Sequence, residues 1–139
     1  MSSCLILNDT LQYTSTNGTN ITMDTFIIQG GRKLSGTIDV QGAKNSVGPI
    51  IAATLLVSGE CIVHNIPRIG DAEVLLGILE SMGAQVTWEG HSTARIDCTN
   101  IDPLKIDYTA VKRIRLSVLL IGALAQRFGT VRMSVPGGC

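Results

Sequence analysis

One order of elements occurs twice in the chain: an apolar helix, a glycine, an alternating strand and a proline. The first copy runs over residues 50–67 and the second over 119–136. Their glycines, Gly59 and Gly129, are 70 residues apart, the difference between positions 129 and 59. Self-similarity at a fixed period indicates repeated supersecondary units. The second copy lacks the helix and hairpin that follow the first, so we expect these 139 residues to be the front part of a longer protein.

Helix and strand signals complete the repeated unit, which is ordered strand, helix, strand, helix, hairpin. Apolar residues three and four apart predict helices, and short alternating runs between glycines and prolines predict strands. We predict strands at 26–29 and 37–40, a helix at 46–57 with Asn45 or Ser46 as N-cap, a strand at 61–64, a helix at 71–82 capped by Asp71, and a hairpin of strands 85–88 and 93–97. A helix at 111–127, with Asp107 or Thr109 as cap, and a strand at 131–135 follow. The predicted fold class is α/β.

Residues 1–22 differ in composition from the rest. The stretch 8–20 is rich in Thr and Asn and has neither a helical nor a strand period. Segments of this kind bury too little apolar surface to fold alone. We therefore expect 1–22 to be a disordered extension, with Met23 a candidate natural start. Residues 23–43 hold the opening strands, and 44–139 hold the repeated units, the first ending near residue 103.

Composition excludes several classes of function. Eleven basic residues balance eleven acidic ones, so the chain has no basic excess, which argues against nucleic acid or an anionic membrane as partner. The longest apolar runs are about half the roughly 20 residues that span a bilayer. Four cysteines and two histidines fall in no metal-ligand spacing, so we predict no metal site. We expect free thiols and a cytoplasmic location.

Cations stand at two predicted helix starts, where the helix dipole disfavours them. Lys44 follows a strand and precedes the first helix, and Lys112, Arg113 and Arg115 crowd the start of the later one. Such a position suits a cation that meets an anionic ligand together with free backbone amides. The alternative for Lys44 is a solvated loop lysine. The alternative for the later cluster is a solvated basic face, to which Arg113 fits best.

The remaining candidates are side chains outside the predicted helix starts, of which Cys139 is the first. Cys139 follows a glycine pair, where backbone amides can approach an anion, so its thiol is a candidate reactive group. His64 alternates with apolar residues on a short strand and is interpreted as a packed or edge histidine rather than a base. Trp88 fits the core or rim of the hairpin, and Cys61 and Cys98 fit small buried positions.

Several motifs, in a consistent order, resemble those of one enzyme family. They are Gly42-Ala43-Lys44-Asn45 with the Pro-Ile-x-Ala-Ala-x-Leu helix after it, the segment 79–86, the Val111-Lys-x-x-Arg115 helix start, and the stretch from Arg127-Phe-Gly to Pro136-Gly-Gly-Cys139. Over 23–139 the chain closely resembles the UDP-N-acetylglucosamine 1-carboxyvinyltransferase (MurA) family of enolpyruvyl transferases. The related shikimate-pathway transferase fits less well, because its Lys-Ser motif and Gly-Asn-Ala-Gly-Thr loop are absent.

The resemblance implies transfer of enolpyruvyl from phosphoenolpyruvate to the 3′-hydroxyl of UDP-N-acetylglucosamine in peptidoglycan synthesis, and so a role in cell-wall biogenesis, cell shape and division. It implies that Lys44 and Asn45 bind phosphoenolpyruvate and that Arg115 contacts chiefly the UDP-sugar. Cys139 would donate the proton to the methylene carbon and be the target of fosfomycin. Neither a metal nor another cofactor is implied.

The resemblance also implies an inside-out α/β barrel, with helices inside and sheets outside, in which the opening strands join another domain. One departure is Gly48, which replaces a larger apolar residue. Because further site residues of the family lie past position 139, we expect the isolated chain to be inactive and marginally folded without the remainder of the enzyme. Two alternatives stay open: a catalytically silent α/β module that binds a nucleotide-sugar or a partner chain, and a fragment of the shikimate-pathway transferase.

Overall fold

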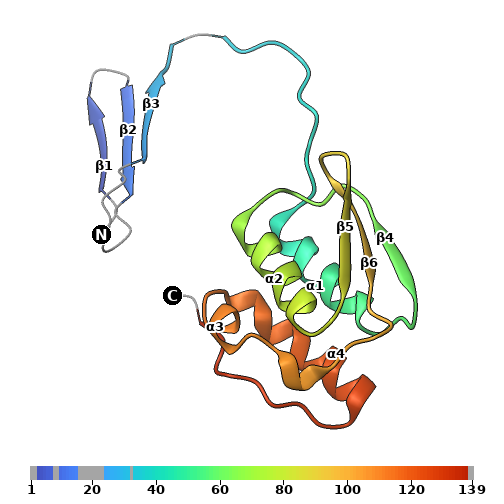
Figure 1. Ribbon diagram of the computed structural model, residues 1–139. Coiled ribbons are helices and arrows are strands. Elements are labelled where there is room, and N and C mark those ends of the chain that lie inside the picture. The colour runs from blue at the N-terminus through green and yellow to red at the C-terminus, as the bar shows by residue number, and fades with distance from the viewer. Residues whose placement is uncertain (1–2, 8–9, 16–23, 32, 138–139) are drawn as a thin grey trace. The chain divides into compact units, whose positions relative to one another are not determined.

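The computed structural model describes residues 3–7, 10–15, 24–31 and 33–137. The chain divides into two compact units, Met1–Ile38 and Asp39–Cys139. Figure 1 shows a three-stranded sheet in the first unit and a mixture of helices and strands in the second. The predicted α/β class is confirmed.

The first unit is an antiparallel sheet made of β1 (Ser3–Leu7), β2 (Thr10–Ser15) and β3 (Asp24–Gln29), in that order. In its register, residue 3 pairs with 14 and residue 10 pairs with 29. Two of these strands lie in the segment 1–22, where we expected no regular structure. Some of their residues, such as Ile6 in β1 and Tyr13 and Thr14 in β2, are of types that favour extended backbone. Each strand also finds a neighbour for its backbone hydrogen bonds.

The predicted strand at 37–40 is absent from the described residues. Ile38 and Val40 are both 87% exposed. A strand needs the backbone of a neighbour to pair its N–H and C=O groups, and alternation alone supplies none. The prediction was therefore wrong for this stretch.

The second unit contains a sheet in the order β4-β6-β5, with both pairs antiparallel. The strands are β4 (Glu60–Val63), β5 (Gln85–Glu89) and β6 (Thr93–Asp97), which confirms the predicted hairpin and places the preceding strand beside it. Alternate residues of the central strand, Ala94 and Ile96, are fully buried. This pattern is typical of an antiparallel sheet with one face on the core and the other in solvent.

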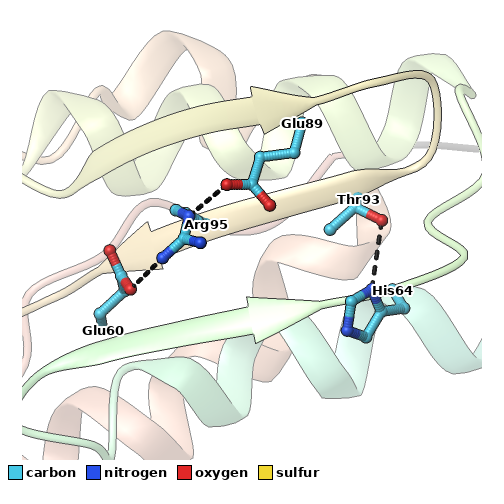
Figure 2. A network of polar contacts seen from close by, with 5 residues as sticks. All are labelled: Glu60, His64, Glu89, Thr93 and Arg95. Atoms are coloured by element: carbon cyan, nitrogen blue, oxygen red, sulfur yellow. Dashed lines mark hydrogen bonds and ion pairs between the residues drawn. The ribbon is translucent and has the colours of Figure 1, made fainter.

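Polar side chains tie the outer face of this sheet together. Arg95 on the central strand forms ion pairs with Glu60 on β4, at 2.5 Å, and with Glu89 on β5. His64 Nδ1 and Thr93 Oγ1 lie 3.2 Å apart at the end of the same strand pair (Figure 2). These contacts join neighbouring strands of the sheet. His64 follows β4, an outer strand, and is exposed, in agreement with its interpretation as an edge histidine.

Two helices cover the buried face, α1 (Lys44–Thr54) against β4 and α2 (Gly70–Ser81) against β5. Both begin one or two residues earlier than predicted, with Ala43 and Ile69 as N-caps and no side-chain capping bond. The predicted caps, Asn45 or Ser46 for α1 and Asp71 for α2, are therefore wrong. Gly83 follows α2 at φ +108, and an added Cβ would press on the backbone oxygen of Asn100.

The predicted helix at 111–127 is broken into shorter pieces. The elements are η1 (Pro103–Lys105), α3 (Tyr108–Val111), η2 (Arg115–Val118) and α4 (Leu119–Phe128). Asp107 caps α3, as predicted, by accepting from the N–H groups of residues 109 and 110. The buried Ser117 hydroxyl lies 2.9 Å from the carbonyl of Val111 and 2.8 Å from that of Ile114. A side chain that occupies these carbonyls competes with a continuous helical ladder.

The stretch 131–135, predicted as a strand, is extended but pairs with no described strand, and Val135 is 85% exposed. α4 packs on α1, and α3 packs on α2, below those two helices in the view of Figure 1. The core thus lies around α1 and α2. Its largest fully buried residues are Ile51, Leu55, Ile66, Leu75, Ile78, Leu79, Met82, Ile96, Leu120 and Leu124. Among the described helices, none has the length and apolarity to cross a membrane.

Candidate anion-binding site

Lys44 is the first residue of α1, and a close backbone contact fixes the loop before it. The Gly42 N–H donates to Asn65 Oδ1 at 3.1 Å. A Cβ added at Gly42 would overlap the backbone carbonyl of Asn65, so only glycine fits without movement. Asn65 itself has φ +57, a left-handed conformation that asparagine tolerates better than most residues. The close approach of the Asn65 backbone therefore explains why the Gly-Ala-Lys-Asn motif begins with glycine.

The ammonium of Lys44 meets a carboxylate from the next helix. Lys44 Nζ lies 2.9 Å from Asp71 Oδ2, and Asp71 is in the first turn of α2. The two helices thus begin close together. An acid in the first turn is favoured by the dipole of α2, and here it also balances a cation that the dipole of α1 disfavours.

The three later cations divide between two elements. Lys112 is the C-cap of α3, with Arg113 directly after it, whereas Arg115 begins η2, which leads into α4. We had predicted that all three crowd a helix start. Because the helix breaks between them, Lys112 and Arg113 stand where a helix dipole favours cations. Only Arg115 keeps the predicted position at the start of a helical element.

Lys44 and Arg115, which are distant in sequence, line a common hollow of about 440 Å³, hereafter the cationic pocket. Its charged residues are Lys44, Asp71, Arg113 and Arg115, and its apolar wall comes from Ile114, Leu116, Val118 and Leu119. Three cations and one carboxylate leave an excess of positive charge. Guanidinium groups present forked donors that match phosphate and carboxylate oxygens. The arrangement is therefore suited to an anionic ligand that also carries apolar surface.

Two predicted site residues are not placed in this pocket. Asn45 is exposed on α1 beside Lys44 and does not line the hollow. Cys139 lies outside the described residues. Two residues before Cys139, the chain comes close to the pocket. The Gly137 N–H is 3.5 Å from the carbonyl of Val111, and Val111 is two residues before Arg113 of the pocket. A Cβ at Gly137 would overlap the backbone carbonyl of Lys112, which explains the requirement for glycine there.

A second polar hollow, of about 380 Å³, lies at the turn that connects the two strands of the hairpin. It is lined by Gln41, Asn65, Ile66, Arg68, His91 and Ser92. Arg68 stacks on the half-buried Trp88, with its guanidinium carbon 3.9 Å from the ring centroid, and pairs with Glu73 at 3.4 Å. Stacking and pairing already occupy this cation, so the hollow is a weaker anion site than the cationic pocket. In the part of the chain that is described, no group of three or more His, Cys, Asp and Glu side chains could hold a metal ion.

Two cysteines of the second unit, Cys61 and Cys98, lie in and beside the sheet. Cys98 is fully buried, and Thr54 Oγ1 lies 3.7 Å from its sulfur. Burial raises the pKa of the Cys98 thiol, against the lowering effects of the Thr54 hydrogen bond and the charge of Arg127. A thiol with a raised pKa is a poor nucleophile at neutral pH. Cys61 is half-buried on β4, and both thiols are free.

Asp71 is the residue of the cationic pocket that the sequence did not reveal. Its position favoured a helix cap, and nothing in the spacing of 27 residues pairs it with Lys44. The apolar wall was equally hidden, because a continuous helix was predicted over 111–127, whereas Leu116 and Leu119 belong to separate elements, η2 and α4. The sequence signal that could have predicted the Lys44–Asp71 pair is the presence of opposite charges at the starts of two successive helices. This arrangement is common in proteins, so it does not identify a pair by itself.

Comparison with known proteins supports an enolpyruvyl transferase fold. The family model described as EPSP synthase (3-phosphoshikimate 1-carboxyvinyltransferase) matches residues 28–139. The crystal structure of the enolpyruvyl transferase NikO from Streptomyces tendae matches 76% of this chain and 25% of its own, with a TM-score of 0.67 and 32% identity. The chain therefore belongs to the enolpyruvyl transferase family that this model describes.

Curated relatives narrow the resemblance further. A protein of Dichelobacter nodosus (strain VCS1703A) is 43% identical over 117 residues, and one of Coxiella burnetii (strain Dugway 5J108-111) is 44% identical over the same length. Both are described as UDP-N-acetylglucosamine 1-carboxyvinyltransferase. The match covers 84% of this chain but 28% and 27% of those relatives, so the chain spans a little over a quarter of their length.

Proposed function

We propose that this chain contributes to the transfer of enolpyruvyl from phosphoenolpyruvate to the 3′-hydroxyl of UDP-N-acetylglucosamine. The observation that carries the proposal is the cationic pocket, in which Lys44 and Arg115 come together from separate helical elements. Both substrates are anions with several charges. The names of the two relatives favour this reaction over others of the family.

Each residue would have a distinct task in an addition and elimination. Lys44, with Asn45 beside it, would hold the phosphate and carboxylate of phosphoenolpyruvate, and Arg115 would hold chiefly the UDP-sugar. Cys139 would give a proton to the methylene carbon while the sugar hydroxyl adds to the neighbouring carbon. The sugar hydroxyl would lose its proton to a base from the remainder of the enzyme. Loss of phosphate, together with return of a methyl proton to the Cys139 thiolate, would then restore the double bond. Fixed cations stabilise the charge that develops on the leaving phosphate.

The approach of the chain toward the pocket supports the role of Cys139. Gly137 contacts the backbone at positions 111 and 112, next to Arg113 and Arg115. A proton donor on this stretch would work beside the cations that bind the acceptor substrate. In the proposed complete enzyme, repeated units form the inside-out barrel, the opening strands join the other domain, and further site residues come from the remainder. We place the reaction in the cytoplasm, where peptidoglycan precursors and free thiols would coexist.

A chimera tests the proposal directly. Residues 23–139 would replace the matching segment of the Coxiella burnetii relative, and phosphate release from phosphoenolpyruvate would be followed with and without UDP-N-acetylglucosamine. We expect sugar-dependent release that falls at least about a hundredfold in Lys44→Met and in Cys139→Ser variants. Arg132→Met, an exposed cation outside the pocket, is the matched control. A folded chimera in which the Lys44 and Cys139 variants keep full activity would contradict the proposed roles.

A second function of the same class is favoured by the description of the family model, which names 3-phosphoshikimate as the acceptor. The pocket cations could bind its phosphate equally well. Calorimetric titration of the chain with shikimate 3-phosphate and, separately, with UDP-N-acetylglucosamine distinguishes the two acceptors. Preference for UDP-N-acetylglucosamine supports the first proposal, and preference for shikimate 3-phosphate supports the second.

A further inference from the structure

Arg113 is the cation of the cationic pocket to which the proposed function gives no role. It lines the hollow together with Lys44, Asp71 and Arg115. Lys44 Nζ lies 2.9 Å from Asp71 Oδ2, whereas Arg113 and Arg115 form no ion pair with an acid among the described residues. The two guanidinium groups are therefore the pocket cations whose charge no carboxylate balances in this part of the chain.

Arg113 also borders a neighbouring hollow of about 340 Å³, whose acids are Glu73 and Asp107. Both acids have other partners. Glu73 pairs with Arg68 at 3.4 Å, and Asp107 Oδ1 accepts from the N–H groups of residues 109 and 110 at 2.8 and 3.1 Å. In the described stretch 33–137, Arg113 forms an ion pair with neither acid. Its guanidinium group is thus available to a ligand of the cationic pocket.

The backbone between Arg113 and Arg115 is anchored in the core. Ile114 is 6% exposed and has an extended conformation, with φ −132° and ψ 141°. The buried Ser117 hydroxyl lies 2.8 Å from the carbonyl of Ile114 and 2.9 Å from that of Val111. Because one extended residue separates the two arginines, their Cα atoms are about 6–7 Å apart. The segment therefore holds two guanidinium groups side by side at one hollow.

This pair of arginines suits a ligand with two adjacent anionic groups. A guanidinium group presents a fork of N–H donors that matches the oxygens of a phosphate. A diphosphate carries two phosphates joined by a single oxygen, so two neighbouring arginine side chains can each contact one of them. UDP-N-acetylglucosamine, the acceptor in the description of both curated relatives, contains such a diphosphate. Phosphoenolpyruvate, in contrast, is assigned above to Lys44 at the start of α1.

We propose that Arg113 is a second arginine ligand of the acceptor substrate: it binds one phosphate of the UDP-sugar diphosphate, beside Arg115. The inference rests on the proposed function, which assigns the UDP-sugar to Arg115. The sequence pattern had favoured a solvated basic face for Arg113. The diphosphate is remote from the 3′-hydroxyl that reacts, so Arg113 governs the binding of the UDP-sugar and takes no part in the chemical step.

The test uses the chimera that carries residues 23–139 in the Coxiella burnetii relative. In calorimetry with UDP-N-acetylglucosamine, Arg113→Met should bind about tenfold more weakly, the lower end for a hydrogen bond to a charged group, because the side chain is exposed. Arg113→Lys keeps the charge without the fork, so it should lose about threefold. In steady-state kinetics the KM for the UDP-sugar should rise by the same factors. We expect kcat and the KM for phosphoenolpyruvate to stay within about twofold of wild type.

Lys112→Met is the matched control, because it removes the neighbouring exposed cation, which does not line the cationic pocket. A general effect of net charge would weaken binding in Lys112→Met and Arg113→Met alike. We expect the Lys112 variant to bind the UDP-sugar within about twofold of wild type, because solvent and salt screen an exposed charge that does not contact the ligand. Arg113→Gln repeats the test if Arg113→Met folds poorly, as judged by circular dichroism.

The outcomes separate this inference from the proposed function. If the chimera releases phosphate in a sugar-dependent manner and Arg113→Met binds the UDP-sugar as tightly as Lys112→Met, the inference fails while the proposed function stands. The inference also fails if Arg113→Met raises the KM for phosphoenolpyruvate and leaves that for the UDP-sugar unchanged. If the folded chimera binds no UDP-N-acetylglucosamine, both fail.

Discussion

Arg127 joins three parts of the second unit, and its removal tests how that unit is held together. From α4, Nη1 donates to the carbonyl of Leu55 at the end of α1 at 2.8 Å, and Nη2 donates to the carbonyl of Thr99 after β6 at 3.1 Å. A typical hydrogen bond contributes about 1 kcal/mol net, and somewhat more with a charged donor. Because Arg127 is half-buried, we take the lower figure for each bond, and Arg127→Met should then destabilise the fold by about 2 kcal/mol.

Urea unfolding followed by the fluorescence of Trp88, the single tryptophan, measures this loss. For a unit of this size, about 2 kcal/mol corresponds to a decrease in Tm of roughly 8–16 °C. Arg127→Lys keeps the charge but cannot span both carbonyls, so it should lose about half as much. Arg132→Met, the same substitution at an exposed position, is the control. If Arg127→Met and Arg132→Met differ by less than about 0.5 kcal/mol, the argument is refuted.

Two further changes test the loop before α1 and the buried thiol. Gly42→Ala should destabilise the unit by about 1–3 kcal/mol in urea unfolding and weaken phosphate binding, because the new Cβ displaces the backbone that leads to Lys44. Gly77→Ala, in α2 with open space around it, should instead stabilise by up to about 1 kcal/mol, and equal effects of the two would contradict this reading. In alkylation by iodoacetamide at pH 8, Cys61 should react before Cys98, because burial raises the pKa of Cys98 and shields it. Similar rates for the two thiols in the native state, by mass spectrometry, would show that Cys98 is not held in the core.

The sequence predicted well those elements whose structure is determined by residues close to one another in the chain. The α2 stripe of Val74, Leu75, Ile78 and Leu79 ends at a glycine that takes positive φ, and the hairpin alternates between core and solvent. The failures depend on distant partners. The stretches 37–40 and 131–135 alternate correctly but have no described strand to pair with. Helical periodicity across 111–127 could not show that Ser117 occupies the carbonyls of Val111 and Ile114.

The sequence predicted two cations of the candidate site, Lys44 and Arg115, but not the carboxylate of Asp71 that pairs with Lys44. Lys44 and Arg115 stood out because cations at helix starts are unfavourable, and the structure brings both to one pocket. The same argument misjudged Lys112 and Arg113, since they follow the end of α3. Asp71 could not be assigned to Lys44, because a long-range ion pair leaves no mark on local spacing. Cys139 lies outside the described residues, so its role rests on the family resemblance and on the contact that Gly137, two residues before it, makes with Val111.

The measurement that tests the central claim most directly is a ¹⁵N chemical-shift titration, with phosphoenolpyruvate in the presence of UDP-N-acetylglucosamine, of the chimera that carries residues 23–139 in the Coxiella burnetii relative. The account predicts saturable shifts at the amides of Lys44 and Arg113 to Arg115, which disappear in a Lys44→Met variant. Shifts confined to the other polar hollow, at Asn65, Arg68 and His91, would contradict the assignment of the anion site to the cationic pocket, and so would a saturable response that Lys44→Met leaves unchanged.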